Sequence, residues 1–159
     1  MPYRPSPPAA IALGLAAIAV VAIGAIASLT IGRHFAAKVN GSVTADATAV
    51  GTFSFAVNEC ASGHAFVPGF FGADLRGGGG QALRVVDTGD DARLWLYPRG
   101  GGHHPLGIDK QSCSEWDVLV DWAHVTVNRV KTVSGHVRVT CVTGGGKLTA
   151  HVDFEHCAL

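Results

Sequence analysis

The chain has 159 residues, a length that favours one domain, and its formal net charge is zero, from 12 Lys and Arg against 12 Asp and Glu. Residues 1–38 contain Arg4, Arg33 and Lys38 and no acid, so nine cations face twelve acids in the remainder, a net charge of −3 (9 − 12). A weakly acidic domain without a basic stripe excludes nucleic acid as an expected partner. Clustered glycines, abundant Val and Thr, and few helix-forming residues beyond residue 38 predict an all-β fold.

An uncharged apolar segment occupies residues 9–32, after a short N-terminal tail at residues 1–8. As a helix its 24 residues would extend roughly 36 Å, which is enough to cross a bilayer core of about 30 Å. We predict a transmembrane helix that acts as an uncleaved signal anchor, because the apolar run exceeds the h-region of about 7 to 15 residues in a signal peptide. A signal peptide cleaved after Ala27, in the small-x-small sequence Ala25-Ile26-Ala27, is the alternative.

Residues 33–51 are mostly small and polar and predict a linker or stalk, which leaves residues 52–159 as the extracytoplasmic domain. Within that domain, seven runs have the alternation of strands and are separated by turn residues. They are residues 53–57, 65–75, 82–87, 93–97, 116–128, 135–142 and 147–156. We therefore expect a small antiparallel β-sandwich of about seven strands, Ig-like or jelly-roll-like, preceded by one N-terminal hydrophobic helix.

Two connections and one register can be read from the turn residues. The sequence "DTGDD" at residues 87–91 predicts a tight hairpin, and the Gly- and Pro-rich residues 99–112 predict a long loop. The sequence "TGGG" at residues 143–146 predicts a second hairpin in which Val142 pairs with Lys147. This register matches apolar with apolar residues on one face and polar with polar residues on the other. The pairs are Val137 with Val152, Val139 with Ala150, Cys141 with Leu148, His136 with Asp153, and Arg138 with His151.

The four cysteines, Cys60, Cys113, Cys141 and Cys157, form an even set without C-x-x-C spacing. Behind an export segment the four cysteines predict two disulfides. The positive charges that flank the apolar segment leave the membrane orientation open, and the expected disulfides place the domain outside the cytoplasm. If successive strands alternate in direction, the pairs are Cys60 with Cys157 and Cys113 with Cys141. A bridge from Cys141 to Cys157 would have to span roughly 30 Å of strand. The pairing of Cys60 with Cys141 and of Cys113 with Cys157 stays open as an alternative if the long loop crosses the sandwich. If the domain faces the cytosol instead, the alternative is four free thiols.

Few residues indicate chemistry. His103 and His104 are the candidate metal ligands, with Asp109 or His64 as further ligands, but adjacent histidines diverge on an extended backbone, so we expect no metal site and no cofactor. Asp90 and Asp91 fit a turn better than a catalytic pair. Because no G-x-S-x-G motif occurs and the cysteines are expected to be oxidised, we expect no enzyme.

Five aromatic residues could line a ligand groove or fill the space between two sheets, and we expect core packing. They are Phe66, Phe70, Phe71, Trp116 and Trp122.

The sequence therefore predicts a membrane-tethered extracytoplasmic β-sandwich, a single-pass protein of the cell envelope that serves as a structural or binding module. Its expected partners are the membrane, through the N-terminal helix, and another envelope protein or a small ligand. The alternative is a secreted, signal-cleaved domain that binds a small ligand or a metal through the 99–112 loop.

Overall fold

A computed structural model describes residues 36–98 and 104–158. The predicted N-terminal tail at residues 1–8 and the predicted helix at residues 9–32 lie outside the described residues. Within the described ranges, no helix is long and apolar enough to cross a membrane.

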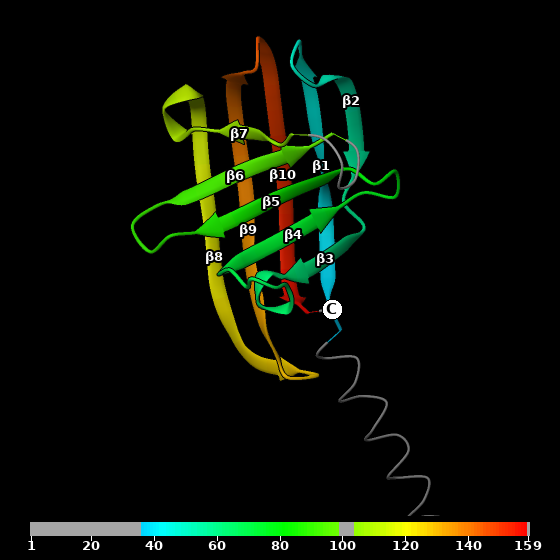
Figure 1. The fold of residues 1–159 in the computed structure, drawn as a ribbon, viewed down its shortest axis with the longest axis vertical. Helices are drawn as coiled ribbons and strands as arrows, with labels where there is room; N and C mark the ends of the chain where they lie inside the picture. The colour runs from blue at the N-terminus through cyan, green and yellow to red at the C-terminus, as the bar shows by residue number, and fades with distance from the viewer. Residues whose placement is uncertain (1–35, 99–103, 159) are drawn as a thin grey trace, which may run out of the picture. The chain divides into compact units, whose positions relative to one another are not determined.

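Two antiparallel five-stranded sheets pack face to face, which confirms the all-β sandwich (Figure 1). The first sheet, in spatial order, contains β2 (Gly51–Ala56), β1 (Lys38–Ala47), β10 (Gly146–Cys157), β9 (Val130–Thr143) and β8 (Cys113–Val127). The second contains β3 (Glu59–Ser62), β4 (Gly72–Arg76), β5 (Ala82–Asp87), β6 (Ala92–Tyr97) and β7 (Leu106–Ile108). Short 3-10 turns lie at Gly63–Ala65 and Lys110–Ser112. The strands of the two sheets cross steeply in this view.

The strand order corrects the expected topology. The second sheet runs β3 to β7 in chain order, and the first runs β8, β9, β10, β1 and β2. Within each sheet, strands that follow one another in the chain are paired, and β10 also pairs with β1. Ig-like and jelly-roll folds require Greek-key connections, so both predictions were wrong, and the described strands number ten rather than about seven. The physical reason is that short turns favour pairing between neighbours in the chain.

Residues 38–47, predicted as part of the stalk, form β1 instead, which lies inside the first sheet between β2 and β10. Val43, Ala45 and Ala47 are buried and alternate with exposed residues. This alternation of buried and exposed residues is typical of a strand, but the side chains are so small that the sequence of the segment resembles a linker. The predicted strand at 65–75 is confirmed only in its last four residues, which belong to β4, and the residues before them form a loop that contains Pro68 and Gly69.

The β9–β10 hairpin has the predicted register. Val142 pairs with Lys147, and the other five predicted pairs are all present. The members of the three apolar pairs are buried in a core that both sheets supply, whereas Val142 beside the turn is exposed. The core includes Val43, Leu75, Leu83, Val85, Leu94, Leu96, Val137, Val139, Cys141, Leu148, Ala150, Val152 and Phe154. The long loop differs in part from its prediction, because residues 106–108 form β7 at the edge of the second sheet.

Two disulfides are present, and they join the pairs that strand alternation predicts. Cys60–Cys157 links β3 of one sheet to the end of β10 in the other, with 5.3 Å between the Cα atoms. Cys113–Cys141 links facing positions of β8 and β9, with 3.8 Å between the Cα atoms. Two disulfides in so small a domain indicate an oxidising compartment.

Candidate functional site

The outer face of the second sheet carries a cluster of charged and aromatic side chains, which we call the Asp74 cluster: Phe66, Phe70, Asp74, Arg76, Arg84 and Tyr97. Strand alternation places it there, because Ala73 and Leu75 of β4 point into the core and Asp74 between them points outward. The pairing of β4 with β5 sets Asp74 directly opposite Arg84. Cross-strand neighbours on one face are close enough for their side chains to interact.

Asp74 is the centre of an ion-pair network. Its Oδ1 accepts a hydrogen bond of 2.8 Å from Nε of Arg84, and its Oδ2 accepts one of 3.1 Å from Nη2. Arg76 donates a longer bond of 3.4 Å to Oδ2. Only 7% of the Asp74 side chain is exposed, so its charge depends on these partners. The hydrogen bonds to Asp74 raise the pKa of Arg84 above its ordinary value, and the guanidinium stays charged.

Aromatic rings enclose the Arg84 guanidinium. Its central carbon lies 4.8 Å from the ring centre of Phe70 and 5.3 Å from those of Phe66 and Tyr97. Arg76 lies 5.6 Å from the centre of the Phe66 ring. Distances below about 6 Å are favourable for a cation over an aromatic face. The rings therefore hold both arginines in place and restrict the access of water to the ion pair.

A closed loop between β3 and β4 presents Phe66 and Phe70 together. The carbonyl of Gly63 accepts hydrogen bonds from the backbone N–H groups of both Phe66 and Phe70, at 3.2 and 3.1 Å. A Cβ at Gly63 would overlap the Phe70 ring, so the tight closure requires glycine. The loop is anchored to the other sheet, because Ser62 Oγ donates to the Lys131 carbonyl at 2.7 Å and Cys60 is bonded to Cys157.

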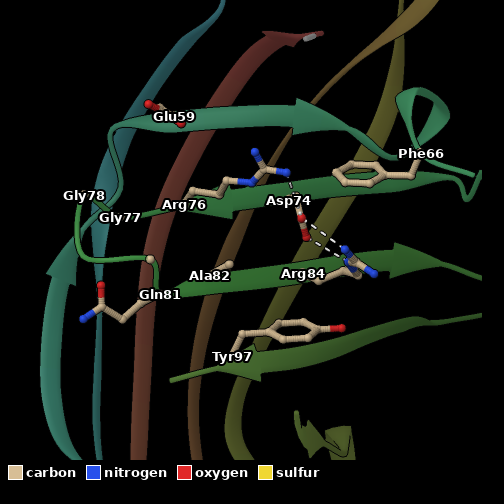
Figure 2. A pocket seen from close by; sticks show the side chains of 11 residues that line it. Glu59, Phe66, Asp74, Arg76, Gly77, Gly78, Gln81, Ala82, Arg84 and Tyr97 are labelled. Atoms are coloured by element: carbon tan, nitrogen blue, oxygen red, sulfur yellow. Dashed lines mark hydrogen bonds and ion pairs between the residues drawn. The ribbon is translucent and has the colours of Figure 1, made fainter. Parts of the chain in front are cut away.

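A pocket of about 540 Å³ lies beside the cluster. Its lining includes Phe66, Arg76, Ala82 and Tyr97, together with the glycine-rich turn 77–80 between β4 and β5. Figure 2 shows Asp74 between the two arginines, with Phe66 and Tyr97 on opposite sides of Arg84. This volume falls in the range of small-molecule sites, about 300 to 1,000 Å³, and the combination of apolar walls with a few polar groups is typical of them.

The candidate metal ligands that the sequence offers are not brought together in the described part of the chain. His103 lies outside the described residues. His104 is exposed and lines a different pocket of about 670 Å³, next to Thr48 and Phe53. His64 and Asp109 are also exposed. Within residues 36–98 and 104–158, no group of three or more His, Cys, Asp or Glu side chains is arranged to hold a metal ion.

The predicted aromatic cluster divides into two parts. Phe71, Trp116 and Trp122 pack against the core as expected, and Phe71 stacks on Trp122 with 4.5 Å between ring centres. Phe66 and Phe70 instead stack on each other over the outer face, with 5.6 Å between ring centres. The predicted turn acids also behave as expected, since Asp91 accepts from the N–H of Ala92 at the start of β6.

Sequence reasoning missed four residues of the Asp74 cluster: Asp74, Arg76, Arg84 and Tyr97. One signal could have identified them. "GADLR" and "ALRVVD" are two apolar runs, each interrupted by a charge at the position that alternates with the core residues. Comparison with models of known protein families, with curated proteins and with solved structures finds no match.

Proposed function

We propose that this chain is a membrane-tethered, extracytoplasmic binding module whose binding site is the pocket beside the Asp74 cluster. Residues 9–32 are the proposed tether, and residues 38–158 form the proposed extracytoplasmic domain. The two disulfides support a location outside the cytoplasm, because reducing conditions in the cytosol disfavour such bonds.

The observation that carries the proposal is a buried ion pair placed on the outside of the sandwich. Arg84 and Asp74 lie on the face of the second sheet that points away from the core, yet Asp74 is almost fully buried. A loop bearing Phe66 and Phe70 covers the ion pair. Because buried ion pairs are a weak source of stability, stability alone does not explain this arrangement. The arrangement fixes charged and aromatic groups at the wall of a pocket, which is what a binding site requires.

The compartment is tested with a reporter enzyme that is active only outside the cytoplasm, fused after Leu159. We expect activity, together with two intact disulfides in non-reducing peptide maps. Cytoplasmic activity would refute the location. Recovery of the intact N-terminus from washed membranes is expected for an anchor, whereas a mature chain that begins at Ser28 would show cleavage and support a secreted protein.

Binding is tested with the full-length chain in an uncharged detergent, by nuclear magnetic resonance titration with small fragments of positive, negative and zero charge. We expect at least one fragment to shift the signals of residues 76–82 in a saturable way. Substitution Ala82→Leu, which fills the floor of the pocket, should abolish these shifts. If no fragment of any charge perturbs this region, the proposed binding function is wrong.

A further inference from the structure

We infer that the pocket binds a flat small molecule that carries an oxyanion, a carboxylate or a phosphate, and that Arg76 holds the oxyanion. The inference rests on the proposed function and specifies its ligand class. It depends on three features of the pocket: the unused donors of Arg76, the fixed position of its guanidinium, and the hollow over Ala82.

Arg76 has hydrogen-bonding capacity that the described chain does not use. A guanidinium has five N–H donors, and in the described residues Arg76 makes one side-chain hydrogen bond, the 3.4 Å contact with Asp74. Arg84 differs, because it donates two bonds to the same carboxylate and is the more buried of the two, with 28% of its side chain exposed against 36% for Arg76. Arg76 is therefore the guanidinium available to a ligand, and the fork of its donors matches a carboxylate or phosphate.

The ion pairing in the pocket, rather than its net charge, favours an anion at Arg76. Two acids, Asp74 and Glu59, and two arginines, Arg76 and Arg84, line the pocket, so their formal charges balance. Asp74 makes its shortest ion pair with Arg84, at 2.8 Å, and a longer one with Arg76, at 3.4 Å, so Arg76 shares its acidic partner with Arg84. Glu59 faces Arg76 across the β3–β4 pair, but Figure 2 shows its carboxylate directed away from the guanidinium. Within residues 36–98 and 104–158, Asp74 is the one acid within ion-pair distance of Arg76.

Asp74 and Phe66 position the Arg76 side chain. The bond to Asp74 holds one end of the guanidinium, and the Phe66 ring covers one of its faces at 5.6 Å. A guanidinium restrained in this way loses less conformational freedom when it binds an oxyanion than a free one does. Arg84 and Asp74 are thus positioning residues, and Arg76 is the binding residue.

The hollow that would receive the body of the ligand results from a small residue between two large ones. Ala82 lies on β5, directly opposite Arg76 on β4 and Tyr97 on β6. Two strand spacings of about 4.8 Å separate Arg76 from Tyr97, a distance of roughly 10 Å. Arg76, Ala82 and Tyr97 all line the pocket, and Ala82 contributes only a methyl group to this interval. A flat ring can therefore lie between the side chains of Arg76 and Tyr97.

The experiment titrates the full-length chain, in an uncharged detergent, with five probes that separate charge from shape. Benzoate and phenyl phosphate carry a ring and an oxyanion, and they distinguish a carboxylate from a phosphate ligand. Benzylamine carries the ring with a cation, benzyl alcohol carries it without charge, and acetate carries the oxyanion without a ring. We expect benzoate or phenyl phosphate to shift the Arg76 Nε–H signal and to bind about tenfold more tightly than the other three.

Three substitutions test the assigned roles. Arg76→Gln should weaken the binding of the preferred anion by about tenfold. Glu59→Gln should strengthen it by roughly twofold, because it removes a negative charge near the pocket. Arg93→Gln is the matched control, since Arg93 is exposed on β6 and does not line the pocket. Amide spectra of each variant show whether the domain is still folded.

The outcomes separate this inference from the proposed function. Anion preference that Arg76→Gln removes and Arg93→Gln preserves would support both. Binding at residues 76–82 by benzylamine or benzyl alcohol as tight as that of benzoate would overturn the anion inference and leave the binding site in place. Loss of affinity in Arg93→Gln equal to that in Arg76→Gln would also overturn it. The absence of binding by every probe would refute both proposals.

Discussion

Replacement of Asp74 by asparagine tests whether burial gives the Asp74–Arg84 pair its energetic importance. The substitution preserves the size of the side chain and removes its charge, and the remaining amide can present an N–H group to the guanidinium of Arg84. Asp74 is 7% exposed and accepts bonds of 2.8 and 3.1 Å. Removal of one partner of a buried ion pair costs about 3 to 5 kcal/mol, but Arg84 is 28% exposed and regains some water, so we expect about 2 to 3 kcal/mol.

The chain contains a matched control on its other sheet. Asp153 accepts a bond of the same 2.8 Å length from Arg138, but 64% of its side chain is exposed. Asp153→Asn should therefore cost about 0 to 1 kcal/mol. Both pairs join an aspartate to an arginine with a shortest bond of 2.8 Å, but Asp74 is buried and accepts two further bonds. The comparison therefore measures burial together with those added bonds.

The assay is urea unfolding of the full-length chain in an uncharged detergent with the disulfides intact, followed by the fluorescence of its three tryptophans. With a slope of about 2 kcal/mol per molar urea, the Asp74→Asn midpoint should fall by about 1 M. The Asp153→Asn midpoint should stay close to that of the unaltered protein. Equal shifts for the two variants would refute the reasoning, because they would show that burial of Asp74 contributes nothing beyond a surface ion pair.

Three further predictions concern the disulfide, the loop and the acid range. Replacement of both Cys60 and Cys157 by serine should lower the free energy of unfolding by about 4 to 5 kcal/mol, since the bridge closes a span of 97 residues; urea unfolding measures this. Gly63→Ala should cost about 1 to 3 kcal/mol and displace the Phe70 ring, visible in the ring signals; an unchanged ring environment would contradict the close packing. The pKa of Asp117 should lie below about 3.9, because His136 hydrogen-bonds to it, so its stabilising contribution is present above that pH and is lost as pH falls below it. A carboxyl titration midpoint at or above about 3.9 would refute this assignment.

The elements predicted most accurately from the sequence are those that a local pattern specifies fully. The β9–β10 hairpin has a glycine-rich turn and two long alternating strands, and a shift of one residue would turn both sets of apolar side chains toward solvent. Its register was therefore determined without knowledge of the rest of the fold. The same register, with strand alternation, predicted the pairs Cys60–Cys157 and Cys113–Cys141.

The inner strand β1 was missed because its pattern is weak in isolation. Val43, Ala45 and Ala47 bury little surface each, and a strand of small residues resembles a linker until its neighbours are known. Its burial depends on β10, which lies about a hundred positions later in the chain. A strand that forms through such distant pairing depends on tertiary contacts more than on its own propensity.

The candidate site was not predicted because no short segment contains it. Asp74, Arg84 and Tyr97 lie on three strands, and their proximity depends on the β4–β5 and β5–β6 registers. Residue type alone does not distinguish Phe66 and Phe70, which lie over the outer face, from Phe71, which packs against the core. Their different positions depend on the path of the closed loop. The interrupting charge at Asp74 was the available signal, and its meaning required knowledge of which residue faces it.

The arrangement of the site has a consequence for how its residues tolerate substitution. On β4 and β5 the site residues alternate with core residues, so Arg76 and Ala82 can change without altering the side chains that fill the space between the sheets. Asp74 is the exception, because its burial couples the ion pair to the free energy of folding. Variation at Arg76 and Ala82 would therefore alter binding at little cost in stability, whereas variation at Asp74 would alter both, and the comparison of the Asp74→Asn and Arg76→Gln variants measures this separation directly.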